Sequence, residues 1–431
     1  MPVSRVVVVG ASVAGIRAAQ ALRSGGFDGD VVVAGAEDVT PYDKPPLSKQ
    51  LISGESTAED IGLLSGGADF ELRLGRAATG LDPDARLVTL AGGERLGYDA
   101  LVIATGVRAR TLPGAAGDLV TTVRELRDST ALRARVAAGD PVVVIGGGFI
   151  GAEVAAAART CGCAVTIVEQ HPAPFARVLG AATGGLVTAL HEAHGVTVLA
   201  GATVTAVEAV PSGGALVRLA DGRSLAAGTV VAGIGCVPNT DWLAGSGLPL
   251  EDGVLTDERC AVRRSADADG TGAIYAIGDV ARWYDVADGV SRRVEHWTSA
   301  VEQASLVAHQ VLHPDQPRTH ASVPYFWSDQ YDRKIQMVGR ASDGDTVEVL
   351  RCATPAGDRD VAIYSRAGRF TAAVTFGWPR ASVAARQAWP RGTDAAVVRA
   401  AIAELSSGVT AVIPSTGAAA DGGLAVGAGH P

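Results

Sequence analysis

The chain opens with an apolar run that leads into glycines and then into a helical pattern. Residues 5–26, RVVVVGASVAGIRAAQALRSGG, predict a buried strand, a glycine turn and a helix that ends at two adjacent glycines. Residues 28–37, DGDVVVAGAE, predict a second strand that finishes at Glu37. Together these parts form one strand–turn–helix–strand unit.

The same pattern returns later in the chain. Residues 140–162, DPVVVIGGGFIGAEVAAAARTCG, predict a strand, a glycine turn and a helix, and residues 163–170, CAVTIVEQ, predict a strand that finishes at Glu169. Gly10 and Gly146 begin the two turns, 136 residues apart (146 − 10). Each unit is followed by a predicted hairpin and a short apolar strand, at 85–106 and 214–235. This repetition favours an internal duplication.

The chain changes character near residue 321. Beyond it lie aromatic-rich predicted strands, SVPYFWSDQ and DVAIYSRAGRFTAAVTF, and a predicted helix, TDAAVVRAAIAELSS. We therefore predict an α/β fold with two Rossmann-like dinucleotide-binding domains and a C-terminal α+β domain. The predicted domains are a discontinuous first domain at 1–108 and 247–320, a second at 109–246, a C-terminal domain at 321–405 and a flexible Gly/Ala-rich tail at 406–431.

Composition narrows the function class. A length of 431 residues predicts more than one domain, and 47% hydrophobic and 19% charged residues describe a folded protein. The net charge of −9 argues against a nucleic-acid binder. No apolar run is long enough to span a bilayer, and no export signal is visible. Five cysteines, an odd number, fit a reducing compartment, so we expect a cytoplasmic protein, a monomer or weak homodimer.

The two glycine turns carry the first chemistry. A G-x-G-x-x-G turn lets a pyrophosphate approach the backbone at a helix N-terminus, and an acid at the end of the next strand binds a ribose. The second copy matches completely, with Glu169 eighteen residues after the last of its glycines, Gly146, Gly148 and Gly151. In the first copy, Ser12 replaces the middle glycine. Such turns also occur for packing alone, but here the full context is present twice.

Glu169 predicts which nicotinamide cofactor binds. A carboxylate at this position pairs with a ribose 2′-hydroxyl and repels a 2′-phosphate, so the second site should favour NADH over NADPH. His171 and Arg177 lie nearby but do not form a basic cluster that would reverse the preference.

With these parts in order, the sequence resembles the flavin-dependent ferredoxin reductases of bacterial oxygenase systems, such as putidaredoxin reductase and the reductase components of biphenyl-type dioxygenases. Their domains are glutathione-reductase-like. The resemblance covers nearly the whole chain to about residue 405, and it rests on PYDKPPLSK, YDALVIATG, GGGFIGAEVAA, GIGCVPNT, IYAIGDVA, RVEHWTSAVEQA and VPYFWSDQYDRKIQMVG. It implies FAD at the first site, NADH at the second, and a two-iron two-sulfur ferredoxin as electron acceptor.

The resemblance also implies site residues. For FAD these are Gly10, Ser12, Ala14, Gly15, Glu37, Lys44, Lys49, Ala78, Ala104, Thr105, Gly106, Arg124, Asp279, Trp297 and Trp327. For NADH they are Gly146, Gly148, Phe149, Ile150, Gly151, Glu169 and Gly235. Within the FAD set, Asp279 is expected to hold the ribityl chain or a phosphate. Trp297 and Trp327 are expected to face the flavin ring. Lys44 stands where arginine is usual.

Lys49 and Glu153 are the candidate catalytic residues. Only three lysines occur in the chain, and two of them lie in the proline-rich segment PYDKPPLSKQ at 41–50, which suits the placement of a charge. We predict that Lys49 pairs with Glu153 beside the nicotinamide, where an ammonium favours the reduced flavin. The alternatives are a surface lysine at 49 and, at 153, an acid favoured by the dipole of a first helical turn.

Several other residues that could carry chemistry are expected to have structural roles only. Hydride transfer needs no acid/base group, so His296 is expected to have no such role. Trp327 is expected at the flavin edge, with its aromatic neighbours Tyr325, Phe326 and Tyr331 in the core. No C-x-x-C pair exists for a disulfide reductase, so we expect small buried apolar side chains at Cys161, Cys163, Cys236, Cys260 and Cys352.

Three functions remain open. The first is an NADH-dependent ferredoxin reductase that serves a haem monooxygenase or a Rieske dioxygenase. The second keeps FAD and NADH but uses another acceptor, such as rubredoxin, a nitrite reductase module or oxygen. The third is an NADH-responsive binding protein that resembles apoptosis-inducing factor. For ferredoxin docking, the candidate contacts are Arg292, Arg293, Arg333 and Lys334.

Overall fold

The structure is a computed structural model that describes residues 3–64, 68–113, 119–211, 213–263, 274–321, 323–389 and 392–415. The chain divides into two compact units. Unit 1 consists of Met1–Pro46, Thr57–Arg108 and Cys236–Ser322, and unit 2 of Leu47–Ser56, Ala109–Gly235 and Val323–Pro431. The proline-rich segment crosses the boundary between Pro46 and Leu47, so Lys44 belongs to unit 1 and Lys49 to unit 2.

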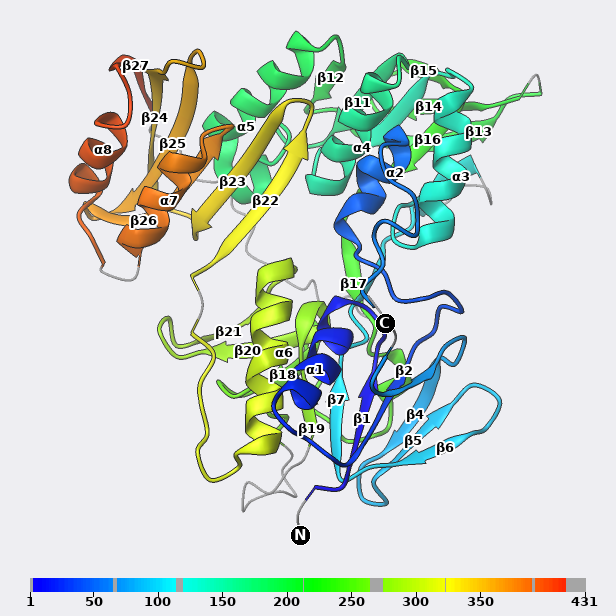
Figure 1. The fold of residues 1–431 in the computed structure, drawn as a ribbon. Coiled ribbons are helices and arrows are strands. Elements are labelled where there is room, and N and C mark those ends of the chain that lie inside the picture. Colours follow the sequence, from blue (N-terminus) through cyan, green and yellow to red (C-terminus); the bar gives the residue numbers. More distant parts are fainter. Residues whose placement is uncertain are drawn as a thin grey trace. The chain divides into compact units, whose positions relative to one another are not determined.

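Unit 1 is built on a five-stranded parallel sheet in the order β19-β7-β1-β2-β3. Its strands are β1 (Arg5–Val9), β2 (Asp30–Ala34), β3 (Glu71–Arg73), β7 (Ala100–Ile103) and β19 (Ile274–Ala276). Helices α1 (Val13–Ser24) and α6 (Trp297–Leu312) lie side by side and pack on this sheet through one apolar cluster (Figure 1).

Smaller sheets complete unit 1 on the other side of the parallel sheet, where a second apolar cluster lies. One contains β4 (Ala78–Asp82), β5 (Leu87–Leu90) and β6 (Arg95–Gly97). Another contains β18 (Val254–Thr256), β20 (Ala281–Asp285) and β21 (Val290–Arg293). The remaining elements are β8 (Val107–Ala109), which pairs with β17 (Cys236–Pro238), and the 3-10 turns η3 (Asp241–Leu243) and η4 (Gly278–Val280).

The first half of unit 2 repeats this plan with the sheet order β12-β11-β10-β16-β9. Its strands are β9 (Val120–Thr121), β10 (Val142–Ile145), β11 (Val165–Glu169), β12 (Thr197–Ala200) and β16 (Thr229–Ala232). A meander of β13 (Val204–Ala209), β14 (Ala215–Leu219) and β15 (Ser224–Ala227) follows. Both units thus place the glycine-turn strand between the following strand and the strand after the hairpin, which supports the duplication.

The helices of this half include one short insertion from the proline-rich segment. They are η1 (Pro45–Ser48), α2 (Gln50–Ser53), α3 (Leu126–Ala137), α4 (Phe149–Thr160) and α5 (Ala176–Ala193). Helix α5 is kinked at Gly180, whose φ of +74° favours glycine.

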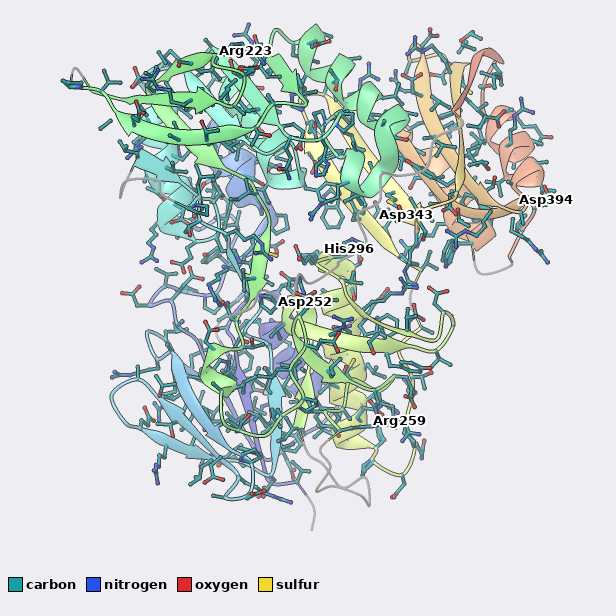
Figure 2. All side chains as sticks on the ribbon, turned by 180° about the vertical axis from the view of Figure 1, so that it is seen from behind. Arg223, Asp252, Arg259, His296, Asp343 and Asp394 are labelled. Atoms are coloured by element: carbon teal, nitrogen blue, oxygen red, sulfur yellow. The ribbon has the colours of Figure 1, made fainter. Side chains whose placement is uncertain are left out.

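The C-terminal part of unit 2 is a six-stranded antiparallel sheet in the order β22-β23-β26-β25-β24-β27. Its elements are β22 (Tyr325–Gln330), β23 (Arg333–Gly339), β24 (Thr346–Ala353), β25 (Arg359–Arg366), β26 (Arg369–Phe376), α7 (Pro379–Ala388), α8 (Ala395–Ala403) and β27 (Gly408–Ser415). One sheet face packs on α4 and α5. The other packs on α7 and α8, where Asp394 caps α8 by accepting from the amide of Ala396 (Figure 2).

The expectation of a flexible tail from residue 406 is wrong for 408–415. These residues form β27, which pairs antiparallel with β24 along its outer edge. The pairing satisfies backbone groups that β24 would otherwise expose, and this outweighs the Gly/Ala-rich composition. Residues 416–431 lie outside the described residues. The parallel sheets of the two units, followed by an α+β sheet, confirm the predicted fold class.

Candidate active site

The first glycine turn is closed by contacts that exclude any side chain. Gly10 has a φ of +121°, and a Cβ there would lie 2.1 Å from the carbonyl oxygen of Ala104. A Cβ on Gly15 would lie 1.9 Å from the carbonyl oxygen of Gly10. The turn at 10–15 is therefore packed against the Ala104–Thr105–Gly106 turn, and both glycines are required for this close approach.

The N-terminus of α1 fits a pyrophosphate. Ser12 is the N-cap residue with extended backbone, and its side chain makes no capping hydrogen bond. The amide donors of the first turn, which include Ala14 and Gly15, therefore have no side-chain acceptor from the cap, and such amides favour an anion. A Cβ on Gly278 would lie 3.0 Å from the Cβ of Ala14, so η4, which carries Asp279, adjoins this turn.

The acid at the end of β2 is oriented by two side chains. Tyr42 donates to Oε2 of Glu37 at 2.5 Å, and Lys44 donates to Oε1 at 3.0 Å. The Glu37 side chain remains 29% exposed, so it keeps access to a ligand. The orientation suits a carboxylate that accepts hydrogen bonds from a ribose.

The start of α6 is tied to the proline-rich segment inside unit 1. The indole Nε1 of Trp297 donates to Oδ1 of Asp43 at 2.9 Å. His296, labelled in Figure 2, is the N-cap residue of α6, and its side chain makes no capping hydrogen bond. Another predicted FAD residue of unit 1, Ala78, is the first residue of β4.

Unit 1 contains all the predicted FAD residues except Lys49, Arg124 and Trp327, which belong to unit 2.

The second glycine turn has the same construction and an open middle position. A Cβ on Gly146, where φ is +96°, would lie 2.5 Å from the carbonyl oxygen of Gly233, and one on Gly151 would lie 2.0 Å from that of Gly146. At Gly148, the N-cap of α4, the nearest atom would be 3.8 Å away. The turn is therefore rigid at its ends and leaves room at Gly148, as approach of a pyrophosphate requires.

Glu169 is fixed by backbone donors. Its Oε2 accepts from the amide of Gly147 at 2.6 Å, and its Oε1 accepts from the amide of His171 at 2.8 Å. The residue is 6% exposed. The carboxylate is thus held beside the glycine turn in the orientation expected for ribose recognition.

An aromatic group flanks the second turn. The ring centroid of Phe149 lies 4.6 Å from that of Phe175 and 4.5 Å from that of Phe326. Phe175 has a φ of +61°, which is uncommon for a residue other than glycine. By contrast, the Ile150 side chain points outward and is 42% exposed. Phe149 therefore links the nucleotide turn to the C-terminal sheet within unit 2.

Lys49 and Glu153 form the predicted ion pair. Lys49 Nζ lies 3.2 Å from Glu153 Oε1, and the two side chains are only 9% and 6% exposed. Two serines hold the carboxylate further: Ser48 donates to Oε2 at 2.5 Å and Ser328 donates to Oε1 at 2.7 Å. Ser129 anchors the lysine segment by donating to the carbonyl oxygen of Leu47. Lys49 is therefore not a surface lysine.

The position of Glu153 corrects one expectation. The sequence predicts Glu153 in the first turn of its helix. Helix α4 begins at Phe149, however, so Glu153 is its fifth residue and lies beyond the first turn. The dipole of a first turn therefore does not explain an acid here. Burial raises the pKa of Glu153, while Lys49, Ser48 and Ser328 oppose that rise by stabilising the anion.

Lys49 has a second carboxylate partner, which the sequence motifs did not predict. Lys49 Nζ also lies 3.2 Å from Oδ2 of Asp329, and the other oxygen of Asp329 lies 3.4 Å from Lys334 Nζ. Lys334 in turn lies over the ring of Trp327, 5.7 Å from its centroid. Asp329 is 280 residues from Lys49 in sequence, and only its place between Trp327 and Gln330 in the FWSDQ motif could have drawn attention to it.

A buried polar chain continues behind Ser328. Gln330 Nε2 donates to Ser328 Oγ at 3.1 Å, and the hydroxyl of Tyr331 lies 2.9 Å from Nδ1 of His191. His191 is fully buried, and burial lowers its pKa to about 4, against a smaller raising effect of a hydrogen bond with Gln330. The imidazole is therefore neutral near pH 7.

Two further predicted residues have local roles. The backbone amide of Arg124 donates to Asp128 next to the capping box of α3. Gly235, with a φ of +97°, accepts from the amide of Arg110 at 2.9 Å. Both lie in unit 2 with the residues predicted for NADH.

The cysteine expectation is partly wrong. Cys163, Cys260 and Cys352 are buried, as expected, but Cys161 is exposed and Cys236 is half-buried. Cys236 Sγ donates to Glu295 at 2.8 Å, and burial together with this carboxylate raises the pKa of the thiol to about 12. A polar partner thus explains why Cys236 does not behave as a buried apolar residue. A thiol with so high a pKa is a poor nucleophile.

The four candidate docking cations all have acidic partners. Arg293 is only 11% exposed and pairs with Asp252, which Figure 2 labels, so it is not available as a surface contact. The other pairs are Arg292 with Asp285 and Asp288, Arg333 with Asp332, and Lys334 with Asp329. In the part of the chain that the structure describes, no group of acidic, histidine and cysteine side chains could hold a metal ion. Nor does any described helix have the length and apolar character needed to cross a membrane.

Two Rossmann-like units with matching glycine turns and terminal acids define a two-nucleotide oxidoreductase. The sequence matches a family model described as pyridine nucleotide-disulphide oxidoreductase over residues 4–304, and a model described as reductase C-terminal over residues 325–408. The chain belongs to the pyridine nucleotide-disulphide oxidoreductase family. Membership of this family, together with the relatives described below, confirms the prediction that the cofactors are FAD and NADH.

Known relatives agree with the motif resemblance. The chain is 37% identical over 350 residues to the ferredoxin–NAD(+) reductase component of the anthranilate 1,2-dioxygenase system of Burkholderia cepacia, covering 80% of this chain and 84% of that one. It is 33% identical over 350 residues to the rubredoxin-NAD(+) reductase of Pseudomonas putida, covering 80% and 89%. The crystal structure of the covalent putidaredoxin reductase–putidaredoxin complex matches with a TM-score of 0.82 and 31% identity, covering 93% and 99%.

Proposed function

We propose that this protein is an NADH-dependent, FAD-containing ferredoxin reductase whose acceptor is a two-iron two-sulfur ferredoxin of an oxygenase system. The observation that carries the proposal is the buried Lys49–Glu153 pair, whose glutamate lies on α4, the helix that begins at the second glycine turn. The anthranilate dioxygenase reductase component supports the choice of acceptor. The odd number of cysteines supports a reducing, cytoplasmic setting.

Each of the two units carries the residues proposed to bind one of the two cofactors. In unit 1, the α1 amides suit the pyrophosphate of FAD, and Glu37, oriented by Tyr42 and Lys44, suits its ribose. In unit 2, the α4 N-terminus and Glu169 suit the pyrophosphate and ribose of NADH. When bound, FAD accepts a hydride from NADH and releases electrons one at a time to an acceptor.

The residues of this chain position the two cofactors and tune the potential of the flavin, and none of them needs to react covalently. Lys49 contributes a fixed positive charge in a poorly hydrated place, where electrostatic stabilisation is stronger than in water. Glu153, held by Ser48 and Ser328, keeps the ammonium from rotating away. We further propose that Arg124, Asp279, Trp297 and Trp327 line the FAD site, as the family resemblance implies.

An acceptor panel tests the function. The purified holoprotein is supplied with NADH and with a two-iron two-sulfur ferredoxin, a rubredoxin, oxygen or ferricyanide. We expect the ferredoxin to be reduced with the highest kcat/KM of the three biological acceptors, and ferricyanide to report the flavin half-reaction alone. Preference for rubredoxin would replace the acceptor, and the 33% identical rubredoxin reductase makes this the second candidate.

The panel also covers a binding function. Slow turnover with all acceptors, despite full flavin content, would contradict a reductase. It would favour a protein whose NADH-bound form recognises a partner, as in proteins like apoptosis-inducing factor.

A further inference from the structure

All three lysines of this chain are ion-paired. Lys44 has Glu37 as its partner, whereas Lys49 lies 3.2 Å from each of two carboxylates, Glu153 and Asp329. Lys334 completes an alternating row of charges, Lys334–Asp329–Lys49–Glu153, inside unit 2.

The two carboxylates that share Lys49 have different surroundings. The Glu153 side chain is 6% exposed and accepts from two hydroxyls as well as from the ammonium. The Asp329 side chain is 30% exposed and keeps part of its hydration. Burial favours the neutral form of Glu153 and raises its pKa, against the opposing effects of Lys49 and the two serines.

A neutral Glu153 would leave a nearly buried ammonium with one counter-charge. An unpaired charge in such a place is costly, and the lysine side chain would lose its position. Asp329 approaches from strand β22, and its second oxygen is itself held by Lys334. It can therefore balance Lys49 without any movement of Glu153.

We propose that Asp329 is a positioning residue that holds Lys49 in place and charged whether or not Glu153 carries a proton. This proposal deepens the proposed function, since the lysine concerned is the one assigned to the hydride-transfer site.

The small number of lysines gives a direct readout. Incorporation of ¹³C,¹⁵N-lysine yields three side-chain NMR signals, which K44R and K334R assign by elimination. In the wild type we expect the Lys49 signal to keep one chemical shift from pH 8 to pH 5.5. In Asp329→Asn the signal should shift or broaden towards the acid end of this range, because Glu153 is then the only counter-charge left.

A double-mutant cycle separates positioning from ordinary packing. Glu153→Gln alone should leave the Lys49 signal sharp, because Asp329 remains. Combined with Asp329→Asn it should collapse that signal, an effect larger than the sum of the two single changes. Asp360→Asn is the matched control: it removes an aspartate paired with Arg351 on the same sheet, distant in the pairing order from β22. The Lys44 signal, from unit 1, reports whether each variant is folded.

A kinetic measurement completes the test. Asp329→Asn should slow flavin bleaching by NADH on the order of tenfold at pH 6 and less at pH 8, whereas Asp360→Asn should not change it. An unchanged Lys49 signal at all pH values in Asp329→Asn, with additive effects in the cycle, would overturn the proposal. If NADH fails to bleach the wild type, the proposed function falls, while the NMR experiment still decides the role of Asp329.

Discussion

At the scale of single residues, the candidate site is centred on a lysine and a glutamate that are buried together. Two effects oppose each other at Glu153: burial disfavours its anion, and Lys49 with two hydroxyls favours it. Burial is the larger effect, so the pair is weak evidence for stability and stronger evidence for a role in the reaction.

Glu153→Gln tests that role. The amide keeps an oxygen for Ser328 but removes the negative charge of Glu153 itself from beside the proposed nicotinamide site, so we expect NADH to bleach the flavin about 10- to 100-fold more slowly, equivalent to about 1.4 to 2.7 kcal/mol in the barrier. The free energy of unfolding at pH 7 should change by less than about 1 kcal/mol, since the cost of burying the carboxylate disappears together with its attraction. Stopped-flow absorbance and urea unfolding check the two values; an unchanged bleaching rate would refute the role.

Glu153 also gives a signed pH effect. A folded-state pKa above the unfolded value means that the folded protein holds this proton more tightly, so its contribution to stability is largest at low pH. That contribution falls as pH rises from the unfolded to the folded pKa. Relative to the wild type, Glu153→Gln should therefore gain stability over that rise.

Glu169→Gln tests cofactor choice. The wild-type carboxylate should repel a 2′-phosphate, so loss of its charge should reduce the preference for NADH over NADPH about 10- to 100-fold in kcat/KM, in line with a charge-assisted hydrogen bond worth about 1.5–3 kcal/mol. Glu192→Gln, an exposed acid on α5, is the control and should leave the ratio as it is. A Glu169→Gln ratio equal to that of the wild type would show that another group selects the cofactor.

His191 predicts a stability change with the opposite sign to that of Glu153. Its pKa is lowered from 6.5 to about 4, so the folded state binds this proton less tightly than the unfolded state. The contribution of neutral His191 is present above pH 6.5 and is lost as pH falls towards 4, by about 3 kcal/mol in total. His191→Asn, which keeps an acceptor for Tyr331, should flatten the unfolding free energy over this range, whereas exposed His313→Asn should not.

Some residues of the site could be predicted and others could not. The glycine turns and terminal acids follow from local spacing, because each depends on backbone geometry within one unit. The Lys49–Glu153 pair was predicted through the motif resemblance. Asp329 was not, because its partner is 280 residues away and comes from a segment that crosses from unit 1 into unit 2.

At the scale of elements too, features that depend on local sequence could be predicted and those that depend on distant contacts could not. The strand–turn–helix–strand units have continuous apolar runs and clear glycine signals, so β1, α1, β10 and α4 fall where the sequence predicts them. Strand β27 was missed. It contains Pro414, which usually argues against a strand, and it is stabilised by a non-local edge pairing with β24 rather than by its own pattern.

A pair of truncations tests the importance of β27. A chain that ends after Ser407 lacks this strand and leaves the outer edge of β24 unpaired, so we expect Tm to fall by about 5 °C or more and aggregation to increase. A chain that ends after Ser415 keeps the strand and should melt with the full-length protein. Equal Tm values for the two truncations would show that β27 contributes no stability.

At the scale of the whole molecule, the duplicated plan gives each unit one nucleotide turn with its own terminal acid. The C-terminal sheet contributes Ser328 and Asp329 to the Lys49–Glu153 pair of unit 2, so it supports the candidate site. The net charge of the protein is −9, and each of the four candidate docking cations already has an acidic partner. The acceptor is therefore identified by the panel of acceptors and not by these four residues.

The most direct test of the account is anaerobic stopped-flow mixing of the holoprotein with NADH and, separately, with NADPH, with flavin absorbance as the signal. We predict rapid bleaching by NADH and bleaching by NADPH that is slower by about tenfold or more, because Glu169 repels the 2′-phosphate. Slow bleaching by both cofactors would contradict a reductase built around Lys49 and Glu153. Equal, rapid bleaching by both would contradict the part assigned to Glu169.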